Sequence, residues 1–110
     1  MKIYVAGPYS TGNVSTNVKA AVLAGDELAR RGHIVFIPHL TFFWGMLCPH
    51  ENEFWMQQDF GWVRACDALL RLPGESPGAD REVALAESLG KLVYNSTEEV
   101  PLASACPRLE

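Results

Sequence analysis

Short, continuous apolar runs alternate along this chain with longer segments whose apolar residues recur every three or four positions. The runs are too short for helices and are closed by glycine, proline or polar residues, a pattern typical of strands buried on both faces of a sheet. They predict four strands, at residues 3–6, 34–37, 68–72 and 91–95.

The segments with helical spacing predict three main helices. One follows residue 13 as a single apolar stripe and stops at Gly32, and a second, rich in aromatic residues, covers residues 53–65. The third is expected at residues 80–89, with Asp80 as its N-cap and Glu82 in its first turn. Residues 40–52 are expected to form a loop with a little helix.

The order of these elements predicts an α/β fold. A strand, a helix and a second strand within the first 37 residues form a βαβ unit, which implies parallel strands and a right-handed crossover. We therefore expect a three-layer sandwich of the Rossmann or flavodoxin-like type, with a central parallel sheet of about four strands. Residues 1–100 are expected to form one domain, and residues 101–110 a poorly ordered tail.

Length and charge narrow the possible partners. The chain has 110 residues and a net charge of −4, with no block of basic residues. Its nine Lys and Arg residues are outnumbered by acids and form no basic block, so we expect neither a nucleic-acid polymer nor an anionic membrane as its partner. No apolar run is long enough to span a bilayer, and the N-terminus reads as a strand rather than a signal peptide.

The cysteines argue against a disulfide framework or a zinc site. Cys48, Cys66 and Cys106 are odd in number and include no CxxC pair, which favours the reducing cytoplasm. Cys48 and His50, even taken with His39, are too loosely spaced to predict a metal site. We expect no metal and no cofactor.

Polar residues far apart in sequence are predicted to meet at one edge of the sheet, because all parallel strands end there. These are residues 8–12, His39, residues 76–82 and Asn95. Tyr4 lies within the first strand, close enough to reach this edge. Asp59, on the aromatic-rich helix, is expected to overhang it.

This set suits cleavage of a glycosidic bond. The chain lacks the dinucleotide fingerprint, the phosphate-loop lysine and the serine nucleophile elbow. Two carboxylates, Asp59 and Glu82, can instead meet the positive charge that develops at an anomeric carbon and handle protons. Structural roles are open for each residue: a helix-dipole acid for Glu82, a solvated helix face for Asp59, and a core tyrosine for Tyr4.

Four motifs resemble the nucleoside 2-deoxyribosyltransferase superfamily, including its nucleotide N-hydrolase branch. They are IYVAGP at residues 3–8, FIPH at 36–39, DFGW at 59–62 followed by Cys66-Asp67, and SPGADRE at 76–82. The resemblance covers most of residues 2–95 and is closest to a branch of short bacterial and phage members.

The resemblance implies a role for each motif. Glu82 would be the nucleophile on C1′ of the sugar, Asp59 would bind the sugar and handle the base, and Tyr4 would position the nucleophile. Ser76 and Gly78 would hold a 5′-phosphate. Further substrate contacts are expected from Gly7, Pro8, Tyr9 and His39.

One departure concerns phosphate. Hydrolase members carry serine and arginine in the first loop, where this chain has Pro8 and Ser10. Family members are typically dimers or higher oligomers, so a homo-oligomer is expected. The aromatic residues 42–44, Trp55 and Trp62 are expected mainly in the core and the subunit interface, with one or two lining the site.

These observations predict an enzyme that cleaves the N-glycosidic bond of a nucleoside or nucleoside 5′-monophosphate, or transfers its 2-deoxyribosyl group, through a glutamate nucleophile. The alternative is a non-catalytic nucleotide-binding or sensing module of the same fold; a flavodoxin-like electron carrier is a weaker third candidate. The sequence leaves open the base, the sugar, the need for a phosphate, and hydrolysis against transfer.

Overall fold

The computed structural model describes residues 1–105 and has an α/β architecture built on one parallel sheet. The strands are β1 (Lys2–Ala6), β2 (Ile34–Phe36), β3 (Ala68–Arg71) and β4 (Leu92–Tyr94). They are all parallel and lie in the order β2-β1-β3-β4. The predicted fold class, with its sheet of about four parallel strands, is confirmed.

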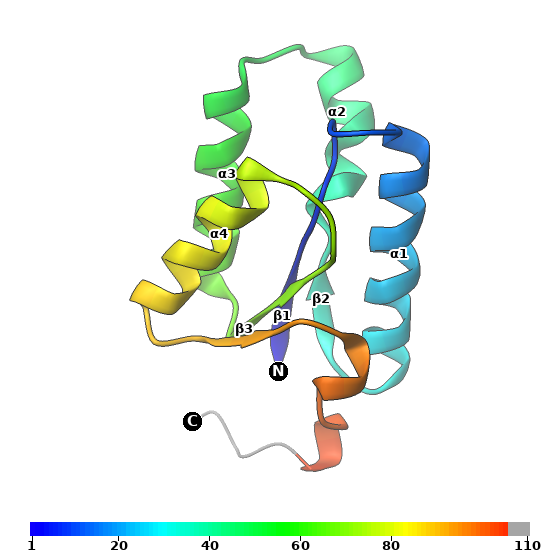
Figure 1. Cartoon of the computed structure of the whole chain (residues 1–110), viewed down its shortest axis with the longest axis vertical. Coiled ribbons are helices and arrows are strands. Elements are labelled where there is room, and N and C mark those ends of the chain that lie inside the picture. The colour runs from blue at the N-terminus through cyan, green and yellow to red at the C-terminus, as the bar shows by residue number, and fades with distance from the viewer. Residues whose placement is uncertain (106–110) are drawn as a thin grey trace.

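Helices cover both faces of the sheet, which makes the three layers visible in Figure 1. Helix α1 (Val14–Arg30) packs on one face, against β1 and β2. Helices α3 (Asn52–Ala65) and α4 (Pro77–Ser88) pack side by side on the other face.

Alternation along the two central strands divides the core between these faces, because successive strand residues point to opposite sides of a sheet. Ile3 and Leu70 belong to a buried cluster with Leu28 of α1. Tyr4 and Leu69 belong to a second cluster, on the side of α3 and α4. The Tyr4 side chain therefore points into the layer that these two helices form.

The two outer strands are shorter and more exposed than their apolar sequences suggest. β2 ends at Phe36, one residue before its expected end, and Ile34 is exposed. β4 covers only residues 92–94, and Leu92 is exposed. Both strands lie at the edges of the sheet, where one side of the backbone has no neighbouring strand to cover it.

Asparagines fix the loop between β1 and α1. Asn13 caps α1, since its side chain accepts a hydrogen bond from the Thr16 amide at 3.0 Å. The Asn17 amide group donates to the carbonyl oxygens of Tyr9 and Thr11, both at 2.8 Å. This loop is therefore held in place by the helix that follows it.

The segment between β2 and α3 carries more helix than the sequence suggested. A 3₁₀ turn, η1 (Pro38–Thr41), leads directly into the short helix α2 (Phe42–Leu47). No residue of α2 is buried, although every residue of the helix except Gly45 is apolar or aromatic. Its apolar character could not reveal a helix, because it does not form a one-sided stripe.

The start of α4 differs from the prediction. The helix begins at Pro77, and its N-cap is Ser76, whose hydroxyl oxygen accepts from the Ala79 amide at 3.1 Å. Proline is favoured at the first helical position and serine before it, so this pair starts the helix earlier than Asp80 would. Asp80 as N-cap was wrong, and Glu82 lies in the second turn rather than the first.

The segment after β4 returns toward the C-terminal end of α1 (Figure 1). It contains two 3₁₀ turns, η2 (Thr97–Glu99) and η3 (Ala103–Ala105), and the Ala103 amide donates to the Arg31 carbonyl at 3.1 Å. The predicted tail extends beyond this point, and its residues 106–110 lie outside the described part of the chain. Within residues 1–105, every helix is too short or too polar to cross a membrane.

Candidate active site

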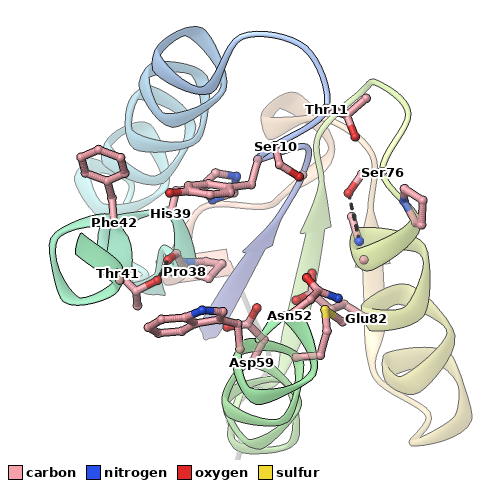
Figure 2. A pocket seen from close by; sticks show the side chains of 18 of the residues that line it. Ser10, Thr11, Pro38, His39, Thr41, Phe42, Asn52, Asp59, Ser76 and Glu82 are labelled. Carbon is pink, nitrogen blue, oxygen red and sulfur yellow. Dashed lines mark hydrogen bonds between the residues drawn. The ribbon is translucent and has the colours of Figure 1, made fainter. Parts of the chain in front are cut away.

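A cavity of about 760 Å³ lies at the carboxyl edge of the sheet. The chain leaves β1 toward β2 on one side and returns to β3 on the other, so the strand connections diverge between β1 and β3. Open α/β sheets bind ligands at such a point. Figure 2 shows the cavity, with the loops that carry Ser10 and Ser76 above it and Asp59 and Glu82 at its floor.

Glu82 lines this cavity and is only 5% exposed. Helical side chains lean toward the N-terminus of their helix, which brings the carboxyl group back toward the sheet. There the Tyr4 hydroxyl donates to Glu82 Oε2 at 2.6 Å. Tyr4 is fully buried behind Glu82, so it contacts the carboxyl group rather than lining the cavity.

Asp59 completes the group from the opposite helix. It lies on α3, lines the cavity, and interacts with both Glu82 and Tyr4. The three residues come from β1, α3 and α4, and are separated by 55 and 23 positions along the chain (59 − 4 and 82 − 59). The structure therefore brings together the three predicted catalytic residues.

Burial and mutual repulsion hold protons on this pair of acids. Burial raises the pKa of Glu82 to about 8, and the negative charge of Asp59 adds to the effect, while the Tyr4 hydrogen bond opposes it. Burial likewise raises the pKa of Asp59 to about 6. The same burial, with two carboxylates nearby, raises the pKa of Tyr4, so its hydroxyl keeps its proton and remains a donor. The two carboxyls titrate together and share a proton near neutral pH.

His39 forms part of another wall of the cavity and is 4% exposed. Its Nε2 lies 3.0 Å from the Pro8 carbonyl oxygen and therefore carries the proton that it donates. Burial lowers the pKa of His39, which keeps the ring neutral. Its Nδ1 is buried and has no hydrogen-bond partner among residues 1–105, so its acceptor lone pair is unsatisfied at the cavity wall.

The other predicted contact residues divide into two groups. Gly7, Tyr9, Ser76 and Gly78 line the cavity. Pro8 does not, and acts instead through its carbonyl contact with His39. Asn95 also lies outside the cavity lining, since β4 is an edge strand, two positions away from β1.

The N-terminus of α4 presents an amide to the cavity. The Ala79 amide is used by the Ser76 cap, Pro77 has no N–H, and Asp80 N bonds back to the Ser76 carbonyl at 3.0 Å. The Gly78 amide has no acceptor within the helix, because the first N–H groups of a helix have no carbonyl group one turn earlier. Asp80 points away, forming an exposed ion pair with Arg71 at 3.0 Å.

Several lining residues had no signal in the sequence. Ser10 and Thr11 belong to residues 8–12, which were predicted to meet at this edge, but Thr41, Asn52 and Met56 could not be placed without the positions of α2 and α3. Of the aromatic residues expected in the core or the subunit interface (42–44, Trp55 and Trp62), Phe42 and Trp55 line the cavity. Trp62 instead stacks on Phe36 with ring centroids 4.4 Å apart. No group of three potential metal ligands occurs among residues 1–105.

The fold is shared with known enzymes. A 2-deoxyribosyltransferase from Bacillus psychrosaccharolyticus matches with a TM-score of 0.60 and 23% identity, over 84% of this chain and 69% of that one. A 2-deoxyribosyltransferase from Leishmania mexicana matches with a TM-score of 0.60 and 20% identity, over 84% of this chain and 61% of that one. The chain thus spans about two thirds of the length of these proteins.

Sequence comparison gives one family and no curated relative. No curated protein matches this chain. The model of the family described as "Domain of unknown function (DUF4406)" matches residues 1–95, which include the whole sheet and every residue that lines the cavity. The chain belongs to this DUF4406 family, and it has the fold of the nucleoside 2-deoxyribosyltransferases.

Proposed function

We propose that this protein cleaves the N-glycosidic bond of a nucleoside or nucleoside 5′-monophosphate, through a covalent intermediate on Glu82. The observation that carries the proposal is the group of buried Tyr4, half-buried Asp59 and buried Glu82 at the floor of a cavity at the strand edge. Two solved 2-deoxyribosyltransferases share the fold, which favours this reaction over other uses of two carboxyls.

The reaction divides into two steps. A Glu82 oxygen attacks C1′ as the C1′–N bond breaks, and the bonding electron pair leaves with the base, which takes up a proton from protonated Asp59. Water then attacks C1′, losing its proton to the Asp59 carboxylate, and the ester bond to Glu82 breaks to release the sugar. If a second base attacks in place of water, the product is a new nucleoside.

The cavity walls supply contacts for both halves of such a substrate. Phe42 and Trp55 offer aromatic surface to a base, and the His39 Nδ1 lone pair accepts from a hydroxyl or N–H group. Ser76 and the Gly78 amide face the same space and would receive a 5′-phosphate or a 5′-hydroxyl.

The test is release of free base from a panel of ribonucleosides, deoxynucleosides and their monophosphates, with and without a second base, followed by chromatography. Replacing Glu82 with Gln keeps the shape of the side chain and removes the nucleophile, so turnover should fall on the order of 10³-fold or more. Glu87→Gln, on the exposed side of the same helix, is the matched control and should retain activity. Equal turnover of the two variants would remove Glu82 from the mechanism.

A nucleotide-binding or sensing module is the second candidate. Its support is that the raised pKa of Glu82 keeps much of that residue protonated, and so unreactive, at neutral pH. It predicts that a nucleoside or nucleotide raises the melting temperature, with no free base even after long incubation. Base release that depends on Glu82 would exclude it.

We also propose a homo-oligomer formed through α2. Phe43 and Leu47 are 72% and 83% exposed, while Phe42 and Met46 of the same helix line the cavity. A second copy seated on α2 would cover these apolar side chains and close one side of the site. Light scattering should give a multiple of the monomer mass, and Leu47→Glu should give monomers, unlike Leu23→Glu on exposed α1 surface. A parent protein that is monomeric at a concentration on the order of tens of micromolar would contradict the proposed homo-oligomer.

A further inference from the structure

Arg71 lies behind the proposed nucleophile, on the same face of the sheet. It is the last residue of β3 and pairs with Ala6, whereas Tyr4 pairs with Leu69 two residues earlier. Because side chains alternate along a strand, Arg71 and Tyr4 point to the same layer, which α3 and α4 occupy. The Arg71 side chain is only 15% exposed and does not line the cavity.

The guanidinium group joins the loop after β3 to the first turn of α4. It donates to the carbonyl oxygens of Leu72 and Gly74, the latter at 3.0 Å, and to Asp80 Oδ1 at 3.0 Å. An arginine can hold three acceptors at once because its five N–H donors lie in one rigid plane. Between these attachment points lies Ser76, and Glu82 follows on the same helix.

Arg71 also contributes a positive charge close to a buried acid. Glu82 accepts from the Tyr4 hydroxyl of β1 and interacts with the Asp59 carboxyl of α3, and the positive charge of Arg71, two residues along β3 from the partner of Tyr4, acts on it through space. His39 is neutral across the cavity, and Arg81 beside Glu82 is exposed and paired with Glu53 at 2.9 Å. Asp59 and burial favour protonated Glu82, while Tyr4 and Arg71 favour the carboxylate.

We propose that Arg71 is a positioning residue that fixes the first turn of α4 and supplies a positive charge that favours the carboxylate form of Glu82 for attack on C1′. The inference deepens the proposed function and depends on it for its catalytic meaning. The charge acts through Glu82, since Arg71 does not reach the cavity.

The test is a carbon-NMR titration of the Glu82 carboxyl in protein labelled at the glutamate side-chain carboxyl carbon. The Asp59→Asn background lets Glu82 titrate without its coupled partner, and the signal is assigned by its loss in Glu82→Gln. Arg71→Met, which removes the charge at similar length, should raise the titration midpoint by about one pH unit. Arg71→Lys, which keeps a charge, should raise it far less.

Asp80→Asn is the matched control. It breaks the same ion pair but leaves the Arg71 charge in place, so the Glu82 midpoint should not rise. Backbone amide spectra show whether each variant is folded, and Arg71→Gln, which also removes the charge, carries the test if Arg71→Met is not folded. An unchanged midpoint in Arg71→Met, or equal shifts in all three variants, would overturn the inference.

Base release separates the two proposals. If the parent protein releases base and Arg71→Met moves the acid limb of the kcat profile to higher pH, both stand. If the parent releases base and neither the pH profile nor the NMR midpoint responds to Arg71, the inference fails alone. If no substrate yields base, the proposed function fails, while the titration still measures whether Arg71 acts on Glu82.

Discussion

At the scale of single residues, the surroundings of Glu82 and Asp59 determine what these two acids can do. Burial raises the pKa of both, to about 8 and about 6. Below pH 6 the pair holds two protons, between 6 and 8 it holds one, and above 8 it holds none. The proposed reaction needs one carboxylate to attack and one proton for the leaving base, so the active form is the singly protonated pair in the arrangement that carries the shared proton on Asp59.

The first prediction concerns pH and Tyr4. Base release should follow a bell-shaped profile with limbs near pH 6 and 8, the values given above for the pair. In Tyr4→Phe the carboxyls lose the donor at 2.6 Å that favours their ionised forms, so both limbs should move to higher pH. The maximum rate should fall roughly 10- to 100-fold, as expected for a hydrogen bond to a charged group. A profile unchanged by this substitution would show that Tyr4 is a core residue only.

At the scale of elements, the site depends on how the loop before α4 packs against the loop after β1. Gly74 has φ of +114°, a conformation that side chains rarely allow, and a Cβ there would lie 2.8 Å from Pro8 Cγ. Pro8 in turn holds His39 through its carbonyl oxygen, and the Gly74 carbonyl accepts from Arg71. One close approach thus connects both walls of the cavity.

The second prediction compares two glycines. Gly74→Ala should lower the free energy of unfolding by about 1–3 kcal/mol, because it combines backbone strain with the clash on Pro8. Gly61→Ala, inside α3 with no atom near the new Cβ, should raise it by about 1 kcal/mol, since alanine favours a helix. Urea denaturation measures both. Equal effects would mean that the loop relaxes around residue 74 without strain.

The elements themselves were largely predictable from the sequence. Continuous apolar runs located all four strands, and helical periodicity located α1 and α3, because each pattern reflects a burial that the fold enforces. α2 could not be foreseen, since none of its residues is buried and its apolar residues show no one-sided pattern. The start of α4 was misplaced because Ser76 and Asp80 are both good caps, and only the structure shows which one bonds to an amide.

Much of the candidate site could be predicted as well, because parallel strands must end at one edge. That rule placed Ser10, His39 and Glu82 together from residues far apart in sequence, although Asn95, placed by the same rule, lies outside the cavity lining. It could not distinguish lining residues from supporting ones. Pro8 turned out to hold His39, and Arg71 appeared only as the end of an apolar strand.

At the scale of the whole molecule, a buried acid lowers stability at pH values where it must ionise. The pKa of Glu82 is raised from an ordinary value of 4.5 to about 8 in the folded protein. Between these values the folded state binds a proton that the unfolded state has lost, so stability falls as pH rises. The stabilising contribution of protonated Glu82 is complete below pH 4.5 and is lost as the pH passes 8.

The third prediction follows from this sign. Glu82→Gln keeps a neutral oxygen for the Tyr4 hydroxyl and removes the titration, so its stability relative to the parent protein should grow with pH. Between pH 5 and 8 the difference should increase by roughly 3–4 kcal/mol, since each pH unit between the unfolded and folded pKa values of Glu82 is worth about 1.36 kcal/mol. Urea denaturation at several pH values measures this difference in the free energy of unfolding. Glu87→Gln is the control, and its difference from the parent protein should not change with pH. A pH-independent difference for Glu82→Gln would mean that Glu82 titrates normally.

The central claim is that the sugar becomes bonded to Glu82, and trapping that intermediate tests it most directly. A nucleoside with fluorine at C2′ slows both steps, because the fluorine destabilises positive charge at C1′, and a good leaving base restores the first step alone. Mass spectrometry of the digested protein should then show one fluorosugar on the peptide that contains Glu82, and none in Glu82→Gln. Free base without an attached sugar, or a sugar attached at Asp59 instead, would contradict the account.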